Sequence, residues 1–136
     1  MLNVYISLTS DGLPYEKLKK KHEQIAEQFI ENNSVYKNQI NIIDSLFPGY
    51  VPGESNPIEY LGKSISKMKN ADIVLMPVNY LSSKGCKVEK VTAEVYGIPM
   101  RSYFYTKDNT FILNYFIETI EVDHDYSQNW HKDFNG

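Results

Sequence analysis

This chain of 136 residues has little cysteine, no long apolar run and no excess of positive charge. The single cysteine, Cys86, excludes an internal disulfide framework and a zinc site built from several cysteines. No apolar run approaches the ~20 residues of a membrane span, and the N-terminus has no signal-peptide pattern. Lys and Arg total 14 against 17 Asp and Glu, so the basic face that nucleic-acid binding requires is missing. We therefore expect a cytoplasmic protein that binds neither membranes nor nucleic acids.

Tyrosine, by contrast, is abundant, with 11 residues against 6 Phe and 1 Trp. A tyrosine buries its ring and keeps a hydroxyl for hydrogen bonding, which suits a polar pocket or a subunit interface. It suits a partly hydrated core equally well, and composition does not separate these interpretations.

Apolar patterning predicts alternating strands and helices. Short apolar runs predict strands at residues 2–7, 40–43, 72–78 and 100–105. Apolar residues at helical spacing predict helices at 14–32, 58–68 and 88–95. The apolar stretch 111–117 fits a helix or a strand, and the 44–57 loop is long enough to be functional or mobile.

This order predicts one α/β domain over residues 1–136, with a core at 1–106 and an appendage at 107–136. Because strand–helix–strand crossovers are right-handed, we expect a four- or five-stranded parallel sheet with helices on both faces. Such a three-layer sandwich is of the flavodoxin or Rossmann-like kind.

Ligands of open α/β sheets bind at the carboxyl ends of the strands. There, Ser82, Ser83 and Gly85 precede a predicted helix, whose free N–H groups favour an anion such as phosphate. Ser83 as a simple helix cap is the alternative. Glu89, one turn into that helix, is a candidate nucleophile or base, or merely complements the helix dipole. Tyr5 either reaches Glu89 or is a core tyrosine.

The remaining candidates have simpler interpretations. His22 lies on an apolar helix stripe, which predicts a partly buried residue with its hydrogen bonds satisfied. Cys86 is interpreted as a small buried residue, and the lysines at 17–21 as a solvated helix face. His124 and His131 stand among aspartates, where a solvated tail is the simpler interpretation than a metal site. We therefore expect neither a metal nor a cofactor.

The stretch 70–99 (NADIVLMPVNYLSSKGCKVEKVTAEVYGIP), with VYIS at 4–7, resembles the nucleoside 2-deoxyribosyltransferase-like superfamily. That group includes deoxyribosyltransferases, nucleoside 5′-monophosphate N-glycosidases and many small bacterial and phage proteins. The similarity covers roughly residues 1–106 and rests on Ser83-Lys84-Gly85 followed by Glu89, with Gly97-Ile98-Pro99 in register.

The resemblance implies that Glu89 is the nucleophile that attacks the sugar C1′, and that Tyr5 orients it. Ser83 would bind a 5′-phosphate, as the serine at this position does in the monophosphate hydrolases. The transferases have an acidic residue at the same position. The wider set of expected ligand contacts is Ser7, Ser82, Ser83, Lys84, Gly85, Cys86 and Lys87. Family enzymes usually carry an Asp that assists departure of the base, and this chain has Ser64 at that position. Glu59 or Asp44 could take over the role of that Asp.

These observations predict a nucleotide-binding protein that hydrolyses the N-glycosidic bond of a nucleoside or deoxynucleoside 5′-monophosphate, or acts as a deoxyribosyltransferase. The alternatives are a module that binds or sequesters a nucleotide without turnover, and a scaffold with a vestigial site. Family members complete their sites with a neighbouring subunit, and residues 111–117 are apolar. We therefore expect a homodimer or a dimer-based oligomer with residues 103–117 at the interface, where Tyr126 or Trp130 could reach the partner.

Overall fold

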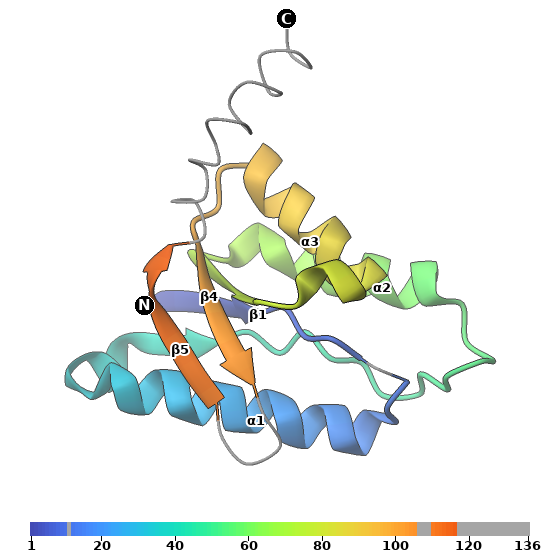
Figure 1. Cartoon of the computed structure of the whole chain (residues 1–136), viewed down its shortest axis with the longest axis horizontal. Coiled ribbons are helices and arrows are strands. Elements are labelled where there is room, and N and C mark those ends of the chain that lie inside the picture. The colour runs from blue at the N-terminus through green and yellow to red at the C-terminus, as the bar shows by residue number, and fades with distance from the viewer. Residues whose placement is uncertain (11, 106–109, 117–136) are drawn as a thin grey trace, which may run out of the picture.

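The computed structural model describes residues 1–10, 12–105 and 110–116 (Figure 1). One five-stranded sheet forms the centre, in the order β2-β1-β3-β4-β5. Its strands are β1 (Leu2–Ile6), β2 (Ile40–Ile42), β3 (Ile73–Pro77), β4 (Met100–Tyr105) and β5 (Thr110–Phe116). The first four are parallel to one another, which confirms the predicted α/β sheet and all four predicted strands.

β5 runs antiparallel to β4 at the edge of the sheet. The stretch that fits either a helix or a strand is therefore a strand, and the five-stranded form of the sheet is mixed rather than wholly parallel. The physical reason is length, because a parallel connection needs a crossover of a dozen or more residues and only four separate β4 from β5.

Helices cover the sheet as α1 (Tyr15–Asn32), α2 (Pro57–Ser66) and α3 (Lys84–Val95). Figure 1 shows α1 on one side of the strands and α2 and α3 on the other. Short 3-10 turns complete the chain as η1 (Ser34–Gln39), η2 (Lys67–Asn70) and η3 (Tyr80–Ser82). The layers follow from strand pleating, since neighbouring strand residues point to opposite faces.

Two apolar cores result from that alternation. Val4 and Ile6 of β1 pack with Ile25 and Phe29 of α1. Tyr5, between them in sequence, faces the other core, where strand residues meet Met68 of η2 and residues of α3. Every residue of β3 is buried, as its continuous apolar sequence predicts for a central parallel strand.

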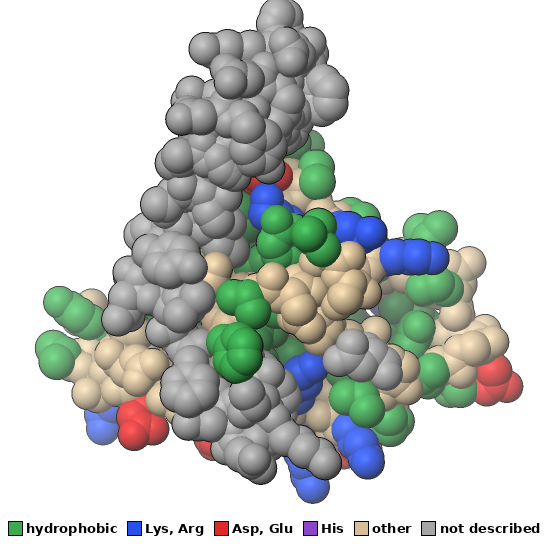
Figure 2. Space-filling view, in the orientation of Figure 1, with side chains coloured by type: hydrophobic (Ala, Val, Ile, Leu, Met, Phe, Trp, Pro, Cys, Tyr) green, Lys and Arg blue, Asp and Glu red, His purple; other side chains and the backbone are tan. Residues whose placement is uncertain are grey.

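Three local expectations need correction. Pro14 is the N-cap of α1, so the helix begins one residue later than predicted. Lys21 is buried instead of solvated, because its Nζ donates to the carbonyl and hydroxyl of Thr9 at 3.2 and 3.0 Å. The valines of α3 (Val88, Val91 and Val95) are exposed, and Figure 2 shows hydrophobic side chains over that helix beside basic ones.

The face of α3 that packs on the sheet carries Cys86, Glu89 and Ala93 instead. A buried glutamate on the inner face of a helix is costly unless it is hydrogen-bonded, so this position calls for a partner. Among the residues that the structure describes, no helix is long and apolar enough to cross a bilayer.

Candidate functional site

The candidate site lies at the carboxyl-terminal edge of the sheet, between β1 and α3. β2 and β3 flank β1 on opposite sides, which places a topological switch point at this edge, where open α/β sheets bind ligands. Tyr5 is in β1, Ser7 follows that strand, and Glu89 belongs to α3. The fold brings Ser7 and Glu89 together although 82 positions separate them in the sequence.

Glu89 accepts two hydrogen bonds from β1 and its continuation. The Tyr5 hydroxyl donates to Oε2, and the Ser7 hydroxyl donates to Oε1 at 2.7 Å. Burial, with only 6% of the residue exposed, raises the pKa of the Glu89 carboxyl to about 7, and the two hydrogen bonds lower it in part. Near neutral pH the group is therefore divided between its two forms, and its ionised form is a desolvated nucleophile or base.

The two donors are themselves held in place. Burial and the neighbouring Glu89 carboxylate raise the pKa of the Tyr5 phenol, so Tyr5 keeps its proton and acts as a donor. The Ser7 N–H donates to the Leu75 carbonyl at 2.9 Å. The Ser7 carbonyl accepts from the hydroxyl of Tyr103 in β4 at 2.7 Å. Tyr103 belongs to the core on the α1 side of the sheet, so Ser7 is fixed from the face opposite Glu89.

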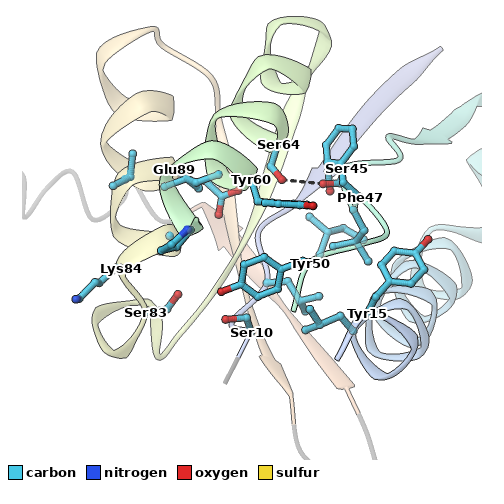
Figure 3. Close-up of a pocket in the computed structure, with 18 of the residues that line it drawn as sticks. Ser10, Tyr15, Ser45, Phe47, Tyr50, Tyr60, Ser64, Ser83, Lys84 and Glu89 are labelled. Carbon is cyan, nitrogen blue, oxygen red and sulfur yellow. Dashed lines mark hydrogen bonds between the residues drawn. The ribbon is translucent and has the colours of Figure 1, made fainter. Parts of the chain in front are cut away.

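A cavity of about 730 Å³ opens beside Glu89, a volume that suits a small ligand. Figure 3 shows Glu89 and Ser83 on one side of it and a group of aromatic side chains across from them. The aromatic wall, as we call this group, consists of Tyr15, Phe47, Tyr50 and Tyr60. Within it, the rings of Tyr50 and Tyr60 pack edge to face with centroids 5.2 Å apart.

Serine hydroxyls supply the polar part of the lining, from Ser10, Ser45, Ser64, Ser82 and Ser83. The Ser64 hydroxyl donates to the Ser45 carbonyl at 2.9 Å, as drawn in Figure 3. Ser64 also lies close enough to Tyr5 to lower the pKa of that phenol. Asp44 and Glu59, which were suggested to take the role of the family Asp, do not line the cavity.

The start of α3 forms the end of the cavity nearest Ser83. Ser83 is the N-cap, and its hydroxyl accepts from the Cys86 N–H at 3.2 Å. The Lys87 N–H donates to the Ser83 carbonyl at 3.0 Å. The first N–H groups of a helix lack partners within it, so Lys84 and Gly85 present the donors available to an anion, rather than Cys86 and Lys87.

The structure divides the predicted site residues into two sets. Those that line the cavity are Tyr5, Ser82, Ser83, Lys84, Gly85 and Glu89. Ser7, Cys86 and Lys87 do not line it. Ser7 instead contacts Glu89, and Cys86 is fully buried, where burial raises the pKa of its thiol and keeps it in the unreactive form.

The aromatic wall was not predicted residue by residue. Its signals in the sequence were the excess of tyrosine and the long 44–57 loop, which contributes Phe47 and Tyr50. His22 is buried, as predicted, and burial lowers the pKa of its imidazole. The prediction that it is hydrogen-bonded is wrong for Nε2, which has no partner among the described residues. His124 and His131 lie outside the described residues, and the described part holds no cluster of three potential metal ligands.

Comparison with protein-family models and with curated proteins gave no match. The fold and the site alone define the class of this protein, which is an α/β protein with a buried glutamate at the switch point of its sheet.

Proposed function

We propose that this protein is a nucleotide hydrolase of the nucleoside 2-deoxyribosyltransferase-like superfamily, which cleaves the N-glycosidic bond of a nucleoside 5′-monophosphate. The observation that carries the proposal is Glu89, a buried carboxylate that lines the cavity while Tyr5 and Ser7 hold both of its oxygens. Two fixed hydrogen bonds give the carboxylate one orientation, which is what attack on a single carbon atom requires.

The cavity offers distinct places for the three parts of a nucleotide. The 5′-phosphate would bind at the start of α3, on the Ser83 hydroxyl, the first N–H groups and the Lys84 ammonium. The sugar C1′ would then lie at Glu89. The base would stack on the aromatic wall, because aromatic side chains accept any nucleobase on their faces.

In the proposed reaction, an Oε atom of Glu89 attacks C1′, and the base leaves with the electron pair of the broken bond. Water then attacks C1′, which frees the sugar phosphate and restores the carboxylate, and the proton that water loses passes through solvent to the base. Tyr5 and Ser7 position the nucleophile and moderate its basicity through the hydrogen bonds that they donate.

Binding of a nucleotide without turnover is the second candidate. Its supporting observation is that, of the described residues lining the cavity, Glu89 alone carries a carboxyl group. A second carboxyl group is the usual acid that assists a departing base, so a site with one favours a binding module over an efficient hydrolase of ordinary nucleotides.

Incubation with purine and pyrimidine nucleoside 5′-monophosphates, in ribose and deoxyribose forms, tests the proposal. Chromatography of released base should show turnover by the wild type that Glu89→Gln abolishes. The matched control is Glu94→Gln on the same helix, where the glutamate pairs with Lys90 at 2.8 Å outside the cavity. Saturable binding of these nucleotides with no base released from any substrate, whatever its leaving group, would establish the binding module instead.

We also propose that the protein acts as a homodimer or dimer-based oligomer. The exposed apolar residues on described elements include Val91 and Val95 of α3 and Phe104 of β4, and exposed apolar patches mark interfaces. Tyr126 and Trp130, the residues expected to reach a partner, lie outside the described residues. Light scattering over a concentration series should give at least twice the 15.8 kDa chain mass, and a monomer throughout would refute the assembly.

A further inference from the structure

The chemistry of the cavity wall facing Glu89 restricts what kind of base can leave. With the phosphate at Ser83 and the sugar at Glu89, as proposed above, the base would lie against the aromatic wall and Ser64, which line the rest of the cavity. The groups there are rings and hydroxyls. Among the described lining residues, Glu89 is the carboxyl group and Lys84, at the phosphate end, is the ammonium group.

A hydroxyl does not replace a carboxylic acid as the proton donor. The Ser64 hydroxyl already donates its proton to the Ser45 carbonyl at 2.9 Å, so that proton is engaged within the protein. The Tyr5 proton is likewise engaged by Glu89. An ordinary nucleobase leaves as an anion unless it is protonated, and loss of a general acid costs about 100-fold to 10,000-fold in rate.

We propose that the preferred substrates are nucleoside 5′-monophosphates whose base is already a cation at the glycosidic bond, such as a pyridinium or an N7-alkylated purine. This inference rests on the proposed function and adds the class of leaving group. When Glu89 bonds to C1′, the electron pair of the broken bond neutralises the cationic ring, which leaves as a neutral molecule. Water then adds to C1′, the bond to Glu89 returns its electron pair to the carboxylate, and the proton of water passes to solvent.

The aromatic wall fits a cationic ring. Aromatic faces attract cations, with the most favourable contacts within about 6 Å of the ring centroid. The Glu89 carboxylate adds a negative charge on the sugar side of the same cavity.

Two matched pairs of substrates test the inference on the wild-type protein. GMP and 7-methyl-GMP differ by one methyl group and its positive charge, and nicotinamide mononucleotide and its 1,4-dihydro form differ by the charge of the ring. We expect kcat/KM to be at least about 100-fold greater for each cationic member. The rate with nicotinamide mononucleotide, whose pyridinium ring keeps its charge as the pH rises, should rise with pH as Glu89 ionises and then stay level.

A gain-of-function variant provides an independent readout. Ser64→Asp introduces a carboxyl group on the base side of the cavity and should raise turnover of GMP by about tenfold or more, with a smaller effect on 7-methyl-GMP. Ser64→Asn, which is similar in size but is not an acid, is the control and should not raise it.

The outcomes separate this inference from the proposed function. Turnover of GMP within about tenfold of 7-methyl-GMP, or an alkaline fall in rate with nicotinamide mononucleotide, shows a proton donor at work. Either result overturns the inference and leaves the hydrolase standing. If both members of each pair bind and neither is cleaved, the hydrolase fails and the inference fails with it. If Ser64→Asp does not fold, the comparison of pairs on the wild type decides alone.

Discussion

Replacement of Glu89 by glutamine should make the folded protein more stable at alkaline pH. Because burial raises the pKa of Glu89 from 4.5 to about 7, the folded state holds the proton more tightly than the unfolded state does. The stabilisation from that proton is complete below pH 4.5 and is lost as the pH rises to about 7. Glutamine does not ionise, so Glu89→Gln escapes this loss.

The magnitude follows from the size of the pKa shift. Each unit corresponds to about 1.4 kcal/mol, so the change from pH 5 to pH 8 costs the wild type roughly 2 to 3 kcal/mol that the variant keeps. At pH 5 the two proteins should be similar, because a protonated carboxyl and an amide are both neutral and each offers the Tyr5 and Ser7 hydroxyls one acceptor oxygen and one donor.

Urea unfolding followed by circular dichroism, at pH 5 and pH 8 and one protein concentration, measures this difference. Glu59→Gln, at an exposed position in the first turn of α2, is the matched control for the loss of a surface glutamate. If Glu89→Gln alters the free energy of unfolding equally at both pH values, the carboxyl is hydrated in the folded protein and the account of the site is wrong.

Three further substitutions test the surroundings of Glu89. Tyr5→Phe removes a hydrogen bond that lowers the Glu89 pKa, so the rising limb of the pH–rate profile should move to higher pH; an unmoved limb would contradict that role. Ser83→Asp keeps a helix-capping oxygen but repels phosphate, so calorimetry should show loss of nucleotide binding with stability changed by under about 0.5 kcal/mol. Unchanged affinity would remove the phosphate site. Tyr103→Phe should cost about 1 kcal/mol of stability and lower kcat without changing KM, because the carbonyl of Ser7 loses its donor. An unchanged kcat would make Tyr103 purely structural.

The central strands and the first helix could be predicted because their patterns are local. β3 is apolar at every position because both of its faces are covered, and α1 carries a regular apolar stripe. The direction of β5 depends on the short connection after β4. The exposure of the α3 valines could not be predicted from local pattern, because tertiary packing places Glu89 on the inner face of that helix.

The site was accessible to sequence reasoning only where a motif marked it. The Ser83 to Glu89 spacing identified the start of α3, and the resemblance paired Glu89 with Tyr5. Tyr103 was missed because its hydroxyl reaches Ser7 from 96 positions away, and no periodicity encodes such a contact. The aromatic wall was missed because it gathers from α1, α2 and an irregular loop.

Trapping of the glycosyl group on the protein tests the central claim most directly. The substrate is a 5′-monophosphate with a pyridinium base and with fluorine at C2′ in the arabino configuration. Fluorine slows both steps, and the good leaving group keeps the first step faster than hydrolysis of the bond to Glu89, so the sugar phosphate should accumulate on the protein. Mass spectrometry of the digested protein should then find the sugar phosphate on the peptide that contains Glu89, and Glu89→Gln should carry none. Release of base with the label on another residue, or with no label at all, would contradict the role given to Glu89.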